Sequence, residues 1–195
     1  MRYEKGHKEL TRRRIIETAA ARFRKDGIEA VGLADLMAEA GLTHGGFYSH
    51  FSSKEDLVKA AIEEAAVVSA GRFKERIEEG GLENWIRSYL RTGHRDHPEK
   101  GCVVAALASE LARHPQATRK GFSEKLAKVL KAVESHLPAN MTPAVKKKTA
   151  VGIFATLVGA IQMARAVDDA QVSDEILEAG IASALALAQI KNKAS

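Results

Sequence analysis

One short segment carries three residue types that could hold a metal ion. His94, Asp96 and His97 place three potential ligands within four residues, which is the best support for an enzyme. They precede Pro98 in an expected loop, and no distant acid or cysteine completes a metal site at a predictable spacing. No phosphate-binding glycine loop or nucleophile motif accompanies them. We therefore interpret them as polar loop residues and predict a protein that is not an enzyme, with no metal and no cofactor.

Cys102 is the single cysteine of the sequence. It follows Gly101 at the expected start of a helix, where the positive helix end and Lys100 could lower the thiol pKa and give a reactive thiolate. One interpretation is a redox-sensing or electrophile-sensing thiol, and the other is a small buried cysteine that fills the core. A lone cysteine also excludes an intrachain disulfide framework.

The elements that carry these residues are expected to be helices. The 195 residues are 45% hydrophobic with only four Pro, and Ala, Leu, Glu, Lys and Arg predominate, which favours an all-α protein. Apolar residues recur at helical spacing, and Gly80-Gly81 interrupts the pattern. The periodicity predicts nine helices, at about 8–26, 33–40, 44–50, 54–79, 82–92, 101–113, 116–137, 142–167 and 173–191.

Two short helices at about 33–40 and 44–50 are joined by the tight turn Gly41-Leu42, with the 8–26 helix packed across them. This is the helix-turn-helix arrangement, in which the second short helix enters the DNA major groove. Phe47 and Phe51 are expected to face the core together, and Thr43 to cap the second helix. A net charge of +5 and the basic first 14 residues, from Arg2 to Arg14, are compatible with a nucleic-acid partner.

The segment from Leu33 to Leu57 closely resembles the signature of the TetR family. The likeness is densest at Ala40-Gly41-Leu42, Phe47-Tyr48, His50-Phe51 and Lys54-Glu55-Asp56-Leu57. The resemblance implies a DNA-binding domain at 8–68 and an effector-binding and dimerisation domain at 69–195. It further implies a cytoplasmic homodimer that represses transcription from palindromic operator DNA and is released by a small-molecule effector. The effector, the operator and the choice between repression and activation do not follow from the sequence.

The resemblance also assigns residues to the DNA contact by position. It implies that phosphates are held by Thr43, Tyr48, His50 and Lys54, and that the residues nearest base edges are Ala34, His44, Gly45 and Tyr48. Gly45-Gly46 departs from the more usual Gly-Thr and disfavours a helix by about 1 kcal/mol per glycine, so we expect this helix to become firm only on DNA. A helical ligand-binding protein that has lost DNA binding therefore remains an alternative.

The remaining helices carry the expected effector pocket and dimer contact. The pocket is expected within the helices between 54 and 137, lined by Trp85, Tyr89, Cys102, Leu107, Leu111, Phe122 and Leu126. Some TetR-like electrophile-sensing repressors are similar around Gly101-Cys102, with a Glu eight residues on, as Glu110 is here. The resemblance implies a four-helix interface from the last two helices of two subunits, with candidate residues Phe154, Leu157, Ile161, Ile181 and Leu185. Burial within one chain is the alternative for these residues. We expect no membrane-spanning segment.

Overall fold

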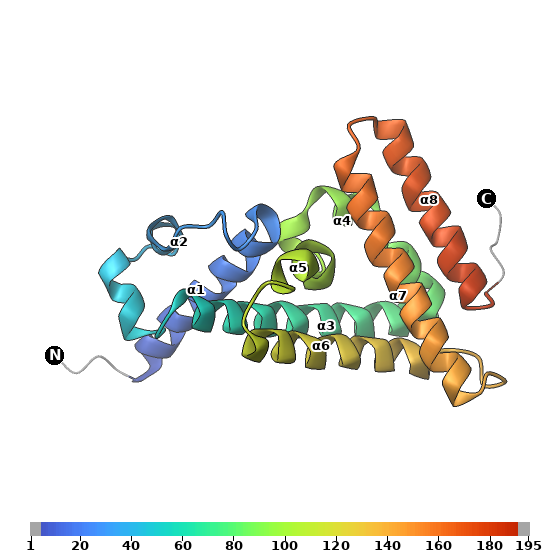
Figure 1. Cartoon of the computed structure of the whole chain (residues 1–195), viewed down its shortest axis with the longest axis horizontal. Helices are drawn as coiled ribbons and strands as arrows, with labels where there is room; N and C mark the ends of the chain where they lie inside the picture. Colours follow the sequence, from blue (N-terminus) through green and yellow to red (C-terminus); the bar gives the residue numbers. More distant parts are fainter. Residues whose placement is uncertain (1–4, 191–195) are drawn as a thin grey trace. The chain divides into compact units, whose positions relative to one another are not determined.

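The computed structural model describes residues 5–190, so Arg2 of the basic first segment lies outside the described residues. The described chain has helices and connecting turns and no strand, which confirms the all-α prediction (Figure 1). Its α-helices and two short 3-10 helices are, in chain order, α1 (Lys5–Asp26), α2 (Leu33–Glu39), η1 (His44–Ser49), α3 (Lys54–Tyr89), α4 (Thr92–Asp96), η2 (Pro98–Lys100), α5 (Val103–Leu111), α6 (Gln116–Ser135), α7 (Pro143–Ala166) and α8 (Ala170–Leu187).

The chain divides into two compact units, each with its own packing. The first unit runs up to Val68 and also contains Pro98–Phe122, and the second contains Ser69–His97 and the chain from Ser123 onward. The segment Pro98–Phe122, which includes α5, thus packs with the helix-turn-helix although it lies beyond residue 68. The functional division at residues 68 and 69 stays a prediction.

The first unit is held by apolar faces of α1, α2, α3 and α5. Phe23 of α1, Leu36 of α2, Leu57 of α3 and Leu111 of α5 are all almost completely buried in one cluster. In each of these helices, apolar residues follow one another at a spacing of three or four residues. Each helix therefore presents one apolar stripe to the shared core. The first unit carries the helix-turn-helix and is called the head below. Its core therefore includes α5.

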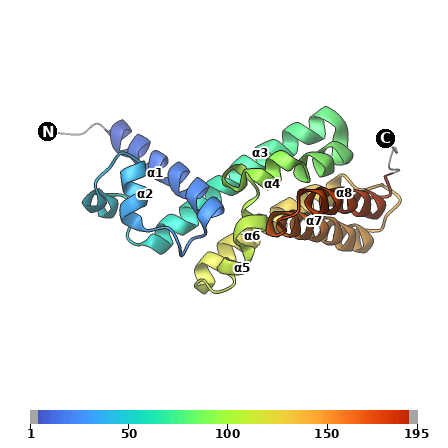
Figure 2. The same cartoon turned by 90° about the horizontal axis from the view of Figure 1, so that it is seen from above.

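In the second unit α7 and α8 lie side by side (Figures 1 and 2). Their contact is close at Gly180, where an added Cβ would lie 2.7 Å from Cβ of Ala160 and 2.8 Å from Cδ1 of Leu90. Only a residue without a side chain fits at this crossing. Asp169 caps α8, since its carboxylate accepts from the backbone N–H groups of Gln171 and Val172. This cap sets the start of α8 at Ala170, three residues before the predicted start.

Three local expectations are decided by the structure. Gly80 and Gly81 leave helical geometry, and Gly81 takes a left-handed φ of 69°, which confirms the predicted break. The loop predicted before Pro98 is wrong, because Thr92–Asp96 forms the short helix α4. The expectation that no segment could span a membrane is also wrong, because α7 is long enough and apolar enough to do so by length and composition alone. One face of α7 is buried in the core of the second unit.

Candidate nucleic-acid interface

The helix-turn-helix lies in the first unit and is anchored by aromatic packing. Leu36 and Met37 of α2 are buried, and the turn at Gly41 closes with a hydrogen bond from Leu42 N–H to the Met37 carbonyl. Phe47 of η1 is fully buried and stacks on Phe51, with ring centres 5.6 Å apart. The prediction that both phenylalanines face the core is confirmed. Burying Phe47 turns the opposite side of η1 outward.

The outward side of the motif carries the residues assigned to DNA by resemblance. The exposed members are Ala34, Thr43, His44, Gly45 and Tyr48, while His50 and Lys54 are half-buried. Tyr48 is 65% exposed, although a tyrosine in a folded protein normally buries much of its large ring. His44 and Tyr48 meet edge to face, with ring centres 6.3 Å apart. The structure thus brings an imidazole and a phenol together on one solvent-facing helix.

The recognition helix differs from the expected α-helix. His44–Ser49 is a 3-10 helix, with hydrogen bonds from Gly46 N–H to the Thr43 carbonyl and from His50 N–H to the Phe47 carbonyl. The predicted Thr43 cap is wrong, since its side chain makes no capping hydrogen bond. The two glycines weaken α-helical propensity, and the tighter 3-10 turn satisfies the short segment.

The start of α3 is fixed by two hydrogen bonds between Asp56 and the two serines before the helix. The Ser53 hydroxyl accepts from Asp56 N–H at 3.1 Å, and the Asp56 carboxylate accepts from Ser52 N–H at 3.3 Å. Both bonds satisfy backbone N–H groups at the helix start, as in a capping box, but the carboxylate accepts from Ser52 rather than from Ser53. It places Lys54 at the first helical position, directly after the turn that ends η1.

His50 closes η1 and is electrically influenced by α1. Burial lowers the pKa of its imidazole, and the positive charges of Lys8 and Arg12 lower it further. Both influences favour the neutral imidazole, in which one ring nitrogen donates a hydrogen bond and the other accepts one.

Family models match both parts of the chain. The model described as bacterial regulatory proteins, tetR family, matches residues 15–61. The model described as the transcriptional regulator LmrA/YxaF-like C-terminal domain matches residues 80–179, more than half of the chain. The chain belongs to the TetR family. Regulators of this family are DNA-binding proteins and not enzymes, so the metal-enzyme alternative is set aside.

Individual relatives agree with this membership. The chain is 30% identical to the uncharacterised regulator YfiR of Bacillus subtilis over 86 residues, which are 44% of this chain and 42% of YfiR. It is 40% identical to TtgR of Pseudomonas putida over 63 residues, 32% of this chain and 30% of TtgR. These matches span less than half of either relative. The crystal structure of reduced NemR from Escherichia coli has the same fold, with a TM-score of 0.73 and 21% identity over 93% of this chain and 96% of that one.

In this TetR-family chain, polar contacts tie the α5 region to the DNA-binding head. Glu110 of α5 accepts hydrogen bonds from the backbone N–H of Ile28 at 2.8 Å and of Glu29 at 3.4 Å. Arg24 of α1 donates to the carbonyl of Glu99 at 3.0 Å. Sequence reasoning missed these contacts. No pattern in the sequence pairs a carboxylate with a backbone amide so far away along the chain.

A third contact joins the α5–α6 connection to the start of α3. His114 meets the carboxylate of Glu55 at 3.0 Å, and the Thr118 hydroxyl donates to the same carboxylate. Thr118 is completely buried, and the side chain of His114 is nearly so. Because Glu55 follows Lys54, this contact reaches the residue next to a predicted phosphate ligand.

The predicted effector-pocket residues are divided between the two units. In the first unit Leu107 and Leu111 are buried, Phe122 packs partly buried against the same core, and Cys102 is the half-buried N-cap of α5. In the second unit Trp85 and Tyr89 are buried against Phe154, and Leu126 is half-buried. The pocket stays a prediction.

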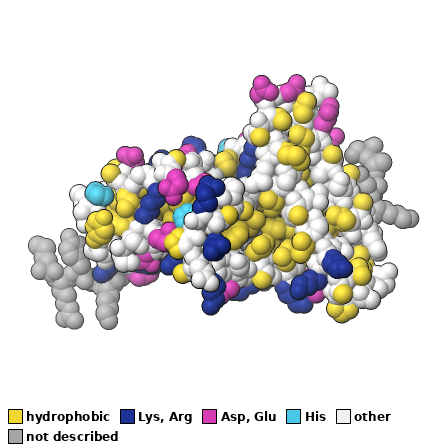
Figure 3. Space-filling model, viewed as in Figure 1, with side chains coloured by type: hydrophobic (Ala, Val, Ile, Leu, Met, Phe, Trp, Pro, Cys, Tyr) yellow, Lys and Arg dark blue, Asp and Glu magenta, His cyan; other side chains and the backbone are white. Residues whose placement is uncertain are grey.

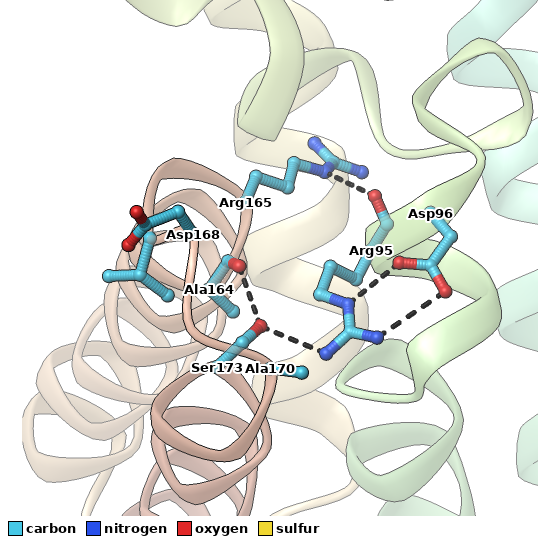
Figure 4. A pocket seen from close by; sticks show the side chains of 8 residues that line it. Arg95, Asp96, Ala164, Arg165, Asp168, Ala170 and Ser173 are labelled. Atoms are coloured by element: carbon cyan, nitrogen blue, oxygen red, sulfur yellow. Dashed lines mark hydrogen bonds and ion pairs between the residues drawn. The ribbon is translucent and has the colours of Figure 1, made fainter.

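The histidine-rich segment of the second unit has a structural role. The buried His94 donates from Nδ1 to the carbonyl of Tyr89 at 2.6 Å, and burial lowers its pKa to about 4. Arg95 pairs with Asp96 at 2.7 Å beside a polar surface hollow of about 260 Å³ (Figure 4). Arg95 also pairs with Asp174 of α8 at 2.7 Å. Arg165 of α7 donates to the backbone carbonyls of His94 and Arg95. These bonds hold α4 against the end of α7 and the start of α8.

The candidate dimer residues require a correction. Phe154, Leu157, Ile161 and Leu185 are buried inside the second unit, so they have almost no surface to offer a partner. The alternative of burial within one chain holds for these four, and only Ile181 remains partly exposed. The apolar faces that periodicity identified are the faces of α7 and α8 that pack within their own unit.

Proposed function

We propose that this chain is a sequence-specific transcriptional regulator that binds palindromic operator DNA in the cytoplasm as a homodimer, represses transcription there and is released by a small-molecule effector. The observation that carries DNA binding is the outward face of η1. His44 and the 65% exposed Tyr48 project from a helix whose other side is anchored by buried Phe47. A solvent-facing tyrosine and histidine on the second helix of a helix-turn-helix suit a major groove.

Within this proposal the contacts divide into two classes. Thr43, Tyr48, His50 and Lys54 hold backbone phosphates, because hydroxyls, imidazole N–H and ammonium groups suit phosphate oxygens. The residues that lie nearest base edges are Ala34, His44, Gly45 and Tyr48. Of these, His44 and Tyr48 have side chains long and polar enough to read a base.

Selection of bound sequences from a random duplex pool tests DNA binding and returns the operator. We expect a palindrome with two half-sites about one helical turn apart, or a multiple of it.

Lys54→Ala should weaken binding to all sequences alike and reduce the salt dependence by about one ion. His44→Ala should change the preference among sequences instead. Lys25→Ala, at the exposed far end of α1, is the matched charge control. Recovery of no sequence by the wild type would refute the proposal and favour a ligand-binding protein that has lost DNA binding.

The homodimer is proposed on the outward faces of α7 and α8. The exposed residues of α7 include Val151, Ala155 and Met163, and those of α8 include the small residues Ala179, Ala182, Ser183 and Ala186. Figure 3 shows hydrophobic side chains on the face of α7 that is turned toward the viewer. Small residues allow two helices to approach closely, and dimers are typical of the family.

Effector release is proposed to act through α5. Cys102 caps the start of this helix, and Glu110 near its end holds the backbone after α1. A group added to Cys102 would displace a helix whose Leu107 and Leu111 are buried in the head. A redox-linked modification of Cys102 is one version of the proposal. A noncovalent ligand near Trp85 and Tyr89 is the other version.

A further inference from the structure

Arg12 of α1 lies over the turn that connects the recognition helix to α3. Its guanidinium carbon is 4.7 Å from the centre of the Phe51 ring. Phe51 is itself buried and stacked on Phe47, so the aromatic surface beneath the guanidinium is rigid. Stacking of this kind attracts the cation to the ring face and restricts the orientation of its planar group. Arg12 is therefore held beside the turn that follows η1.

Lys8 and His50 extend this position into a positive cluster. Lys8 lies four residues before Arg12, hence on the same face of α1, and its side chain is exposed. His50 directly precedes Phe51, and its Nδ1 is buried with no hydrogen-bond partner in the described part of the chain. The charges of both Lys8 and Arg12 act on this imidazole. Two cations and a polar ring with spare hydrogen-bonding capacity thus meet at one place.

Within residues 5–190 no carboxylate lies within ion-pair distance of Lys8 or Arg12. Two other arginines of α1 do have such partners: Arg13 pairs with Glu17 at 2.8 Å, and Arg22 pairs with Asp26 and Glu39. The described first turn of α1 has no acidic residue either. Like charges held close together destabilise one another unless an anion joins them. The cluster therefore fits an anionic ligand from outside the chain.

We propose that Arg12 and Lys8, with His50, bind a DNA backbone phosphate next to those held by η1 and the start of α3. This inference rests on the proposed DNA binding and adds α1 to the interface. The stacked guanidinium presents paired N–H donors to two phosphate oxygens, and Lys8 adds a point charge. Neutral His50 can donate one further hydrogen bond. The site reads no sequence and instead fixes the orientation of the head on the duplex.

The test measures the salt dependence of binding to the selected operator. Lys8→Ala and Arg12→Gln should each lower affinity about tenfold and make the dependence on salt shallower by about one ion. Arg14→Gln, on another face of α1, removes one charge and should leave both quantities near those of the wild type. Arg12→Lys keeps the charge but not the planar group, so it should keep the salt slope and lose part of the affinity.

Replacing single operator phosphates by uncharged methylphosphonates locates the contact. One replacement should weaken wild-type binding and have little further effect on Arg12→Gln, because the partner charge is already gone. Lys8→Ala and Arg12→Gln that both bind with wild-type affinity and salt slope would overturn the site while DNA binding stands. A wild type that binds no duplex overturns the proposed function and this site with it. Lys8 is exposed, so its variant keeps the test valid if Arg12→Gln is poorly folded.

A second readout is independent of DNA. The pKa of His50, followed by NMR in the free protein, should rise in Arg12→Gln and in Lys8→Ala but not in Arg14→Gln, because only the first two remove a charge that acts on it. An unchanged His50 pKa in both variants would show that the three groups do not form one cluster.

Discussion

The carboxylate of Glu110 accepts a hydrogen bond from the backbone N–H of Ile28 at 2.8 Å. Glu110 lies near the end of α5, and Ile28 lies just beyond α1, so the bond fastens the connection between α1 and α2 to a helix far along the chain. Ile28 itself is buried. A charged acceptor on a largely buried backbone donor is among the stronger hydrogen bonds in proteins.

We predict that Glu110→Gln lowers the free energy of unfolding by about 1–2 kcal/mol, because the N–H groups of Ile28 and Glu29 lose a charged acceptor. Urea unfolding measures this loss, and amide hydrogen exchange at Ile28 should become faster. Glu29→Gln, whose side chain is exposed, is the control and should change stability little. Equal stability of both variants and the wild type would show that the Glu110 contact contributes nothing.

Stability should depend on pH through His94. Its pKa is about 4 in the folded protein, mainly because the ring is buried, and Arg165, Arg91 and Arg72 also oppose protonation. The unfolded chain has a pKa near 6.5, so it binds a proton first as pH falls, and stability is lost below that value. We expect a loss of roughly 2 kcal/mol between pH 7 and pH 5 from this residue.

The His94→Asn variant isolates this contribution, since an amide can still donate to the Tyr89 carbonyl but does not titrate. Urea unfolding at several pH values should give a flatter profile between pH 7 and pH 5 for the variant. Parallel profiles for the two proteins would contradict the assignment to His94.

Gly180 should tolerate no side chain. Gly180→Ala would bring its Cβ to 2.7 Å from Cβ of Ala160, so α7 and α8 must shift apart, with an expected cost of about 1–3 kcal/mol. Gly71→Ala is the matched control: Gly71 is exposed in α3 and an added Cβ meets nothing within 4 Å. That control should stabilise by roughly 0.5–1 kcal/mol. Thermal unfolding compares them, and a Gly180→Ala protein as stable as wild type would disprove the close approach.

The outward faces of α7 and α8 should control self-association. Val151→Glu and Ala182→Glu each place a charge on an exposed position, so they should give folded monomers where the wild type sediments as a dimer. Leu157→Glu should unfold the second unit instead, because Leu157 is completely buried. Sedimentation together with circular dichroism separates the two effects. Folded dimers from both exposed-site variants would move the interface elsewhere.

Cys102 provides the last test, of release from DNA. A quinone or peroxide should weaken operator binding by the wild type, since modification adds bulk at the start of α5. Cys102→Ser should bind the operator as the wild type does but lose the response. An equal response from both proteins would eliminate the thiol and leave a noncovalent effector.

The sequence by itself determined the all-α class and the identity of the recognition motif. The positions of Phe47 and Phe51 follow from helical spacing, and the cap at the start of α3 follows from Ser53 and Asp56, because these signals act within a few residues. The break at Gly80-Gly81 is local for the same reason. The family signature lies within one continuous segment and was therefore readable without any tertiary contact.

Only the tertiary structure decided what each apolar face packs against. Periodicity places Leu157 and Leu185 on the apolar faces of their helices. It does not distinguish burial of these faces in their own unit from burial against a second chain. The contacts of Glu110 with Ile28 and of Arg12 with Phe51 join residues far apart in sequence, so no spacing rule contains them. Distant packing, rather than local propensity, thus placed α5 in the DNA-binding head.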